Sequence, residues 1–137
     1  MSKKKVVIGN FNKTKVVPYR ATKDVKFQWC ATRELLETGN GDFSWKKVSS
    51  EDILCKIVKK LQEKEQVSFD EALQTNHCHP KPVSQLAKPM KKKMEALNVT
   101  SLYQIQIEGR HRVYGTLRNG KFHLIYNDAL HKIYNMS

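Results

Sequence analysis

The chain has 137 residues and a formal net charge of +12, with 25 lysine and arginine residues against 13 acidic residues. This length favours one domain, and the charge favours an anionic partner, namely nucleic acid, an anionic membrane surface or an acidic protein. No apolar run approaches the roughly 20 residues that a membrane span needs. The N-terminal MSKKK followed by VVIG lacks the apolar core and cleavage site of a signal peptide, so we expect a cytoplasmic protein without a membrane partner.

The cysteines and histidines do not indicate a metal site. Cys30, Cys55 and Cys78 make an odd number without paired spacing, which favours free thiols in a reducing cytoplasm. The triplet His77-Cys78-His79 is contiguous and has no second cluster elsewhere, whereas structural zinc needs four converging ligands. We therefore expect no metal and no cofactor.

The N-terminal region is strongly basic. Residues 1–26 hold eight lysine or arginine residues and one aspartate. We interpret residues 1–24 as a basic arm, which is either solvated, as termini often are, or adds phosphate contacts or an edge strand. From 25 to 29, apolar residues alternate with polar ones, which predicts the first strand of a single domain over residues 25–137.

A loop at 38–42, with a short strand expected at 43–45, separates this strand from the first helix. Ser49 is a suitable N-cap, and the acidic residues after it favour the positive end of a helix that reaches about Lys64. The apolar stripe of this helix consists of Ile53, Leu54, Ile57, Val58 and Leu61. Its other side carries Lys56, Lys59 and Lys60, which form either a solvated face or a phosphate-binding track.

Two shorter helices are expected next. The capping box Ser68-Phe69-Asp70-Glu71 opens a helix through Leu73. After a loop at 75–82, Pro89 suits the first turn of a helix, so the last helix starts near Lys88. Its buried stripe is Met90, Met94 and Leu97, and Lys91, Lys92 and Lys93 surround that stripe with charge. Lys91 and Lys92, like Lys56, Lys59 and Lys60, are candidate RNA-binding residues.

The C-terminal region predicts a three-stranded antiparallel meander, which gives an α+β fold. Asn119-Gly120 tolerates the positive φ angles of a type I′ hairpin turn. Pairing outward from this turn places an apolar set on the core face: Leu117 opposite Phe122, Gly115 opposite Leu124, and Val113 opposite Tyr126. The other face, expected to be polar and open to solvent or to chemistry, pairs Thr116 with His123, Tyr114 with Ile125, and Arg112 with Asn127.

The first hairpin of the meander needs a loop that keeps its apolar residues on the core face. A two-residue turn at Glu108-Gly109 would bury the glutamines of the preceding strand. We therefore expect a three-residue loop at 108–110. It pairs Ile107 with His111, Ile105 with Val113, and Tyr103 with Gly115.

The C-terminal region contains three recognisable features: a strand with Arg-His-Arg-Val-Tyr-Gly at 110–115, the Asn-Gly hairpin, and a closing Asp-x-x-His-x-x-Tyr at 128–134. In these features the chain resembles the RelE/ParE superfamily of bacterial toxins. The resemblance covers about residues 25–134 and is specific only over 110–134. It implies a small antiparallel sheet, formed by the N-terminal strand and the meander, with helices packed on one face. It also implies cleavage of messenger RNA at the ribosome for RelE-like members and poisoning of DNA gyrase for ParE-like members.

The resemblance carries over to individual residues only in the last strands. Arg112 matches an arginine that lies near the scissile phosphate, and His131 and Tyr134 resemble residues that act as general acid or orient RNA. Cleavage through the 2′-hydroxyl needs a base, an acid and cations but no metal. We expect Arg110 to be a second phosphate ligand, Asp128 to orient the imidazole, and Tyr114 and Tyr134 to stack on bases.

Each of these residues also has an ordinary structural role. Arg112 would pair with Asp128, His131 would cap the last strand, and Tyr134 would belong to the core. The predicted function is a basic, toxin-like, metal-independent endoribonuclease that cleaves messenger RNA, either free or bound to the ribosome. The alternatives are a non-enzymatic module that binds nucleic acid or a protein such as gyrase, and a basic protein whose cationic face is wrapped by an acidic partner, for instance an antitoxin.

Overall fold

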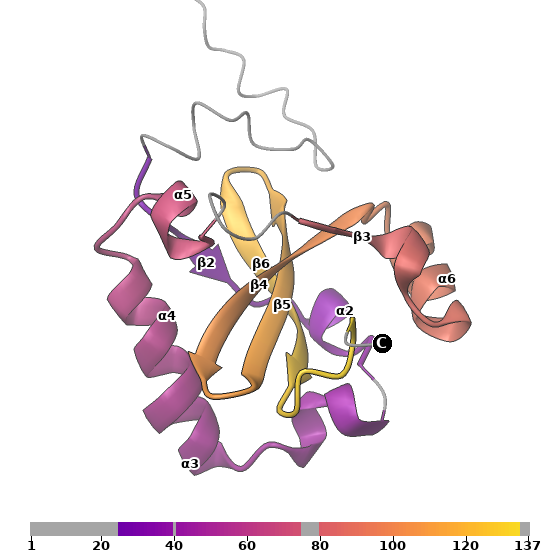
Figure 1. The fold of residues 1–137 in the computed structure, drawn as a ribbon, viewed down its shortest axis with the longest axis horizontal. Helices are drawn as coiled ribbons and strands as arrows, with labels where there is room; N and C mark the ends of the chain where they lie inside the picture. Colours follow the sequence, from indigo (N-terminus) through magenta and orange to yellow (C-terminus); the bar gives the residue numbers. More distant parts are fainter. Residues whose placement is uncertain (1–24, 40, 75–79, 135–137) are drawn as a thin grey trace, which may run out of the picture.

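The computed structural model describes residues 25–39, 41–74 and 80–134 of the chain. The expectations for the basic arm at 1–24 and for the triplet His77-Cys78-His79 fall outside these residues. The described part of the chain forms a five-stranded sheet in the order β2-β6-β5-β4-β3 (Figure 1). The strands are β2 (Trp29–Cys30), β3 (Lys81–Pro82), β4 (Ser101–Glu108), β5 (His111–Arg118) and β6 (Lys121–Asp128).

The α+β class and the C-terminal meander of β4, β5 and β6 are confirmed. The prediction of a purely antiparallel sheet is wrong, because β2 pairs with β6 in parallel, with Trp29 opposite Phe122. The long connection from β2 through the helices allows this parallel pairing. The first strand is also shorter than predicted, although Phe27 before it is buried and packs against Phe69 and Phe122 with ring centroids 5.3 and 5.7 Å away.

The Asn119-Gly120 hairpin has the predicted register near its turn. Leu117 lies opposite Phe122 and Gly115 opposite Leu124. Beyond Gly115 the prediction is wrong, because β6 contains one extra residue, Ile125, and Tyr114 then lies opposite Tyr126. As a result Val113 faces Asn127 and Arg112 faces Asp128 across the two strands.

The first hairpin is close to the prediction. Tyr103 pairs with Gly115 and Ile105 with Val113, as expected. His111, however, pairs with Glu108 rather than with Ile107. The loop is therefore shorter than three residues, and Gly109 in it has a φ of +54°, a conformation that glycine adopts readily.

The helices begin where the capping residues predict. Ser49 accepts a hydrogen bond from the Asp52 amide, and Ser68 accepts one from Glu71. The first long helix comprises α3 (Ser50–Asp52), the π-helical η4 (Ile53–Val58) and α4 (Lys59–Lys64), and the other α-helices are α2 (Arg33–Leu36), α5 (Phe69–Ala72) and α6 (Lys88–Ala96). The π-helix changes the angular spacing of side chains, and Leu54, predicted to be buried, is 64% exposed.

The segment before the first long helix forms 3₁₀ turns instead of the expected strand. These turns are η2 (Gly41–Phe43) and η3 (Trp45–Lys47). Later in the chain, a further 3₁₀ turn, η5 (Val83–Gln85), precedes α6. The Trp45 indole N–H donates to the Ile125 carbonyl at 2.8 Å. This bond joins η3 to the extra residue of β6.

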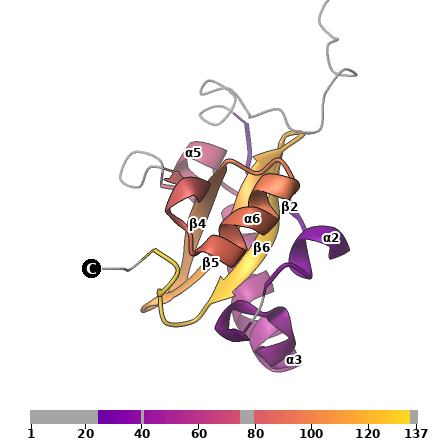
Figure 2. The same cartoon turned by 90° about the vertical axis from the view of Figure 1, so that its right-hand side faces the viewer.

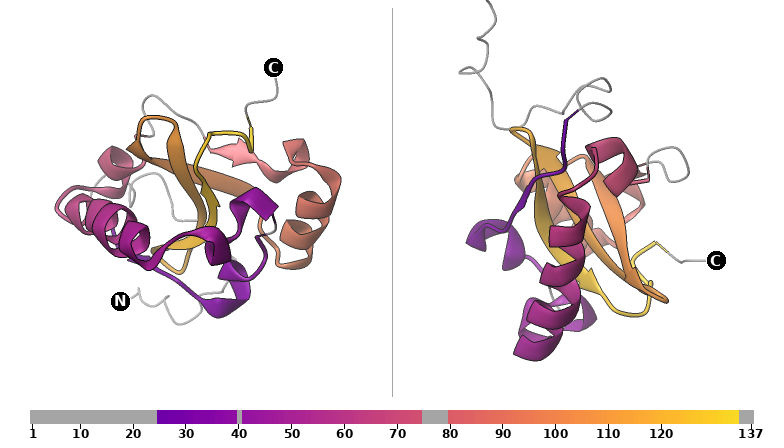
Figure 3. Two further views of the ribbon diagram at one scale, coloured as in Figure 1. Left: turned by 90° about the horizontal axis from the view of Figure 1, so that it is seen from below. Right: turned by 90° about the vertical axis from the view of Figure 1, so that its left-hand side faces the viewer.

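Both faces of the sheet are covered, so the expectation of helices on one face is wrong. Among the described residues, one hydrophobic cluster packs Ile57, Leu61 and Phe69 of the first long helix and α5 against Val113 and Leu124 of the sheet. A second cluster packs Leu35 of α2 and Met94 of α6 against Tyr114, Ile125 and Tyr126. Figure 3 shows the sheet between these two groups of helices.

Gly115 provides a test of this packing. A Cβ atom there would overlap the His123 carbonyl oxygen and lie 2.7 Å from the Phe122 ring, whereas a Cβ on Gly109 would meet no atom within 4 Å. We expect Gly115→Ala to lower the free energy of unfolding by about 3 kcal/mol, because the His123 backbone carbonyl cannot move away from the new methyl group as a flexible side chain could. Gly109→Ala should cost only about 1 kcal/mol, from its positive φ. Urea unfolding measures the free energy of unfolding of both variants. Equal losses of this free energy in the two variants would contradict the packing.

Candidate functional site

A row of polar residues crosses the meander on the face of the second cluster. Arg112 of β5 lies between Gln106 of β4 and Asp128 of β6. The neighbouring row on the same face is Gln104, Tyr114 and Tyr126. The Arg112 row exists because of the extra residue in β6, which moves Asp128 into line with Arg112.

The Arg112 side chain is half-buried and anchored to the nearby loop. Its Nη1 donates to the Gly109 carbonyl at 2.6 Å and to the His111 carbonyl at 3.3 Å. The Gln106 amide donates to the same Gly109 oxygen at 2.8 Å. Both Arg112 bonds use Nη1, one of the three nitrogens of a guanidinium that has five N–H donors. They hold this end of the planar cation against the loop.

Asp128 is 1% exposed, and its carboxylate organises the chain that follows β6. Its Oδ1 accepts from the Lys132 amide and its Oδ2 from the Ile133 amide, both at 2.8 Å. His131, which directly precedes Lys132 in this turn, has a φ of +57°. Asp128 was predicted to orient the His131 imidazole, and the bonds described here instead hold the backbone that carries it.

His131 is half-buried and lies within the electrostatic influence of charges from separate segments. Burial lowers the pKa of its imidazole below the ordinary value, and the positive charges of Arg112 and Lys81 lower it further, while the negative charge of Asp128 raises it. A lowered pKa keeps the imidazole neutral near pH 7, the form that accepts a proton.

Lys81 was missed from the sequence because it lies in a two-residue strand 50 positions before His131. The link between them is Tyr134, whose hydroxyl donates to the Pro82 carbonyl at 3.1 Å. This bond ties the C-terminal turn to β3. In the sequence, Lys81 falls in the expected loop at 75–82, next to Pro82. This local pattern carries no signal that could have identified Lys81 as a site residue.

The two predicted tyrosines are largely used in packing. Tyr114 is fully buried, with its hydroxyl 3.3 Å from Gln104 Oε1, which does not fit its predicted role of stacking on bases. Tyr134 is half-buried, 5.7 Å from the Tyr114 ring between centroids. Burial raises the pKa of Tyr134 strongly, so its hydroxyl is a poor proton donor.

The predicted phosphate-binding lysines are divided between the two faces of the sheet and do not form one track. Lys56, Lys59 and Lys60 belong to the helix that covers the first cluster, and Lys91 and Lys92 belong to α6 on the opposite face (Figure 2). Lys56 lies 3.7 Å from both Asp52 and Glu108, and Lys60 lies 3.6 Å from Glu63. Arg110 is exposed at the hairpin loop and lines a hollow together with Lys56.

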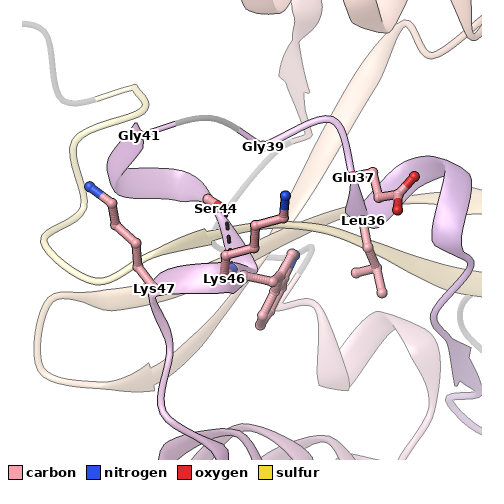
Figure 4. Close-up of a pocket in the computed structure, with 8 residues that line it drawn as sticks. Leu36, Glu37, Gly39, Gly41, Ser44, Lys46 and Lys47 are labelled. Atoms are coloured by element: carbon pink, nitrogen blue, oxygen red, sulfur yellow. Dashed lines mark hydrogen bonds between the residues drawn. The ribbon is translucent and has the colours of Figure 1, made fainter.

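A separate hollow of about 420 Å³ lies between α2 and η3, away from the Arg112 row. Trp45 and Leu36 supply its apolar lining, and Glu37, Lys46 and Lys47 its charges. Figure 4 shows the bond by which the Lys46 amide donates to Ser44 Oγ at 3.1 Å, which fixes the start of η3. None of the predicted site residues lines this hollow.

Comparisons with protein-family models, with curated proteins and with solved structures find no match. The resemblance to the RelE/ParE superfamily therefore remains a prediction. Within the described residues no three metal-ligating side chains gather. Every helix in that part of the chain is too short or too polar to cross a membrane.

The pKa of His131 gives a direct test of this cluster. We expect Arg112→Gln to raise that pKa, because a positive charge that opposes protonation is removed. Lys92→Gln, on exposed α6 surface, removes the same charge elsewhere and should leave it unchanged. Imidazole NMR titrations of the two variants and the unmodified protein would measure this, and equal pKa values in all three would contradict the electrostatic link.

Proposed function

We propose that this protein is a metal-independent endoribonuclease whose reacting groups are His131, Arg112 and Lys81. One arrangement carries the proposal: Arg112 lies opposite Asp128, whose carboxylate holds the turn that carries His131, and Tyr134 ties this turn to β3, which carries Lys81. A neutral imidazole beside cations is suited to take a proton while an anionic group is held next to it.

The reaction follows from these roles. His131 takes the proton from a ribose 2′-hydroxyl, and the resulting oxygen attacks the adjacent phosphorus. Arg112 and Lys81 stabilise the negative charge that grows on the phosphorane oxygens. The bond to the 5′ oxygen breaks, that oxygen takes a proton from solvent, and the products are a 2′,3′-cyclic phosphate and a 5′-hydroxyl end.

Tyr134 and Asp128 have supporting roles in this proposal. The Tyr134 hydroxyl donates to the Pro82 carbonyl and joins the His131 turn to β3, which carries Lys81. The Asp128 carboxylate holds the amides on the C-terminal side of His131. The substrate implied by the RelE-like resemblance is messenger RNA, with the ribosome presenting it, and the implied regulator is an antitoxin that covers the cationic face.

A second candidate is a non-enzymatic module of the same fold that binds nucleic acid or a protein such as gyrase. It is favoured by the anchoring of Arg112 Nη1 on two carbonyl oxygens. In that role Arg112 supports the loop at Gly109, and the basic surface alone attracts the partner. This candidate predicts binding without cleavage.

Replacing the reacting groups separates the two candidates. A general base typically contributes roughly 10²- to 10⁴-fold, so we expect His131→Ala to slow cleavage of a defined message by about that factor. Arg112→Ala should lower the turnover rate more than affinity, because it acts mainly in the transition state. If the two residues act as one unit, the double variant should be little slower than either single one.

The assay is a cell-free translation reaction with and without ribosomes. The matched control is Lys88→Ala, which changes an exposed lysine outside the predicted site. Full cleavage by folded His131→Ala protein would remove that residue from the mechanism. Absence of cleavage by the unmodified protein under both conditions, with binding retained, would support the non-enzymatic module.

The net charge leads to a prediction about salt. Affinity for single-stranded RNA should fall as salt rises, with a slope of about −0.7 for each phosphate neutralised in a plot of log affinity against log salt. Fluorescence anisotropy at several salt concentrations would give this slope. An affinity that stays flat from low to physiological salt would mean that phosphate contacts contribute little.

A further inference from the structure

Two hollows adjoin at the C-terminal end of β6, where this strand passes η3. Lys47, Val48, Asn127 and Ala129 line both of them. Their volumes are about 400 and 380 Å³, each within the range of roughly 300–1,000 Å³ that small-molecule sites occupy. Because they share these residues, they form one continuous depression, which we call the β6 groove.

The β6 groove has an apolar floor and a polar end. Val48 and Ala129 form the floor, and Phe43 and Leu130 extend it on one side. Leu130 is 45% exposed, a large apolar surface left open to solvent. At the other end His111 Nε2 lies 2.6 Å from Asn127 Oδ1. A flat heterocycle with polar edges fits such a lining, since its face is apolar and its edges form hydrogen bonds.

Charges of both signs line the β6 groove. Its carboxylates are Asp42, Asp52, Glu108 and Asp128, and Lys56 lies 3.7 Å from both Asp52 and Glu108. The pair formed by Lys47 is looser. Lys47 lies 3.9 Å from Asp42, and their side chains are 63% and 72% exposed. Exposed pairs at this distance contribute little free energy, so a phosphate can replace the carboxylate as the partner of the lysine. Arg110 lines one end of the groove and Lys132 the other.

The β6 groove and the Arg112 row meet at the turn after β6. Asp128, Ala129, Leu130 and Lys132 of this turn line the groove, while His131 of the same turn belongs to the cluster with Arg112 and Lys81. A polymer that crosses the turn therefore touches both sites. Neighbouring nucleotides of one RNA strand fit this arrangement. The base of one nucleotide can lie in the groove while the phosphate that joins it to the next lies at the Arg112 row.

We propose that the β6 groove binds one nucleotide of single-stranded RNA beside the phosphate that is cleaved. The base lies on Val48 and Ala129, and the flanking phosphates contact Lys47, Arg110 and Lys132. This inference rests on the proposed function and specifies its substrate as an unpaired segment, since a base-paired nucleotide has no free face to place on the floor.

The experiment measures binding without cleavage. The probe is a short fluorescein-labelled single strand of 2′-O-methyl RNA, whose blocked 2′ oxygen cannot attack, and the full chain is titrated against it by anisotropy. Ala129→Trp fills the exposed floor of the groove and should weaken affinity roughly 5- to 100-fold, the range associated with losing a stacked base. Ala31→Trp, at an exposed position that lines neither hollow, should leave affinity unchanged.

A second variant guards against misfolding of the first. Lys47→Glu alters a side chain that is 63% exposed and should also weaken binding, while circular dichroism checks that each variant is folded. Affinity that is unchanged in both folded groove variants would overturn the proposal, as would failure of the unmodified protein to bind the probe. Loss of affinity in these variants, with none in Ala31→Trp, supports it even if no cleavage is ever seen, in which case only the nuclease function fails.

Discussion

A β-bulge at Ile125 of β6 determines which side chains pack in the second hydrophobic cluster. In a regular strand, neighbouring residues point to opposite faces. Here Ile125 and Tyr126 both join the second hydrophobic cluster, because Ile125 is an extra residue without a partner on β5. The bulge thereby lets β6 bury Leu124 on one face and two consecutive side chains on the other. It also moves Asp128 opposite Arg112, which creates the polar row.

A buried carboxylate then converts the end of a core strand into a turn of defined shape. Burying an unpaired charge is costly, and Asp128 avoids this cost by accepting the amides of Lys132 and Ile133. The same bonds hold His131 at its positive φ. Ile133, which follows, is buried in the second cluster. Hydrogen bonding and apolar burial thus fix the position of the one histidine in this turn.

The lysines that give the protein its positive charge are spread over the molecule, whereas the charges that act on His131 are confined to one region. The lysines of the first long helix and of α6 lie over opposite faces of the sheet, so they contribute a diffuse positive field rather than a single track. Such a field attracts polyanions from a distance without selecting among them. Charges from separate segments, those of Arg112, Asp128 and Lys81, act together on one imidazole only in the turn that carries His131.

The sequence by itself determined the local features, because each depends on a few neighbouring residues. Ser49 and Ser68 cap helices through their own hydroxyls, and Pro89 lies in the first turn of α6. Asn119-Gly120 forms a turn that determines the pairing of the residues next to it. The composition likewise determined the net charge, and the order of the predicted helices and strands indicated the α+β class. The RelE/ParE-like function it suggested remains a proposal.

Only the tertiary structure decided which distant residues meet. The bulge at Ile125 arises because both faces of the sheet must be filled, and no local pattern shows that helices cover the second face. Tyr114 is fully buried for the same reason, although strand alternation placed it on the open side. The parallel pairing of β2 and the position of Lys81 depend on connections many residues long. Local patterns record the preferences of each segment, whereas register, layer order and site geometry are set by how all segments bury their apolar surfaces together.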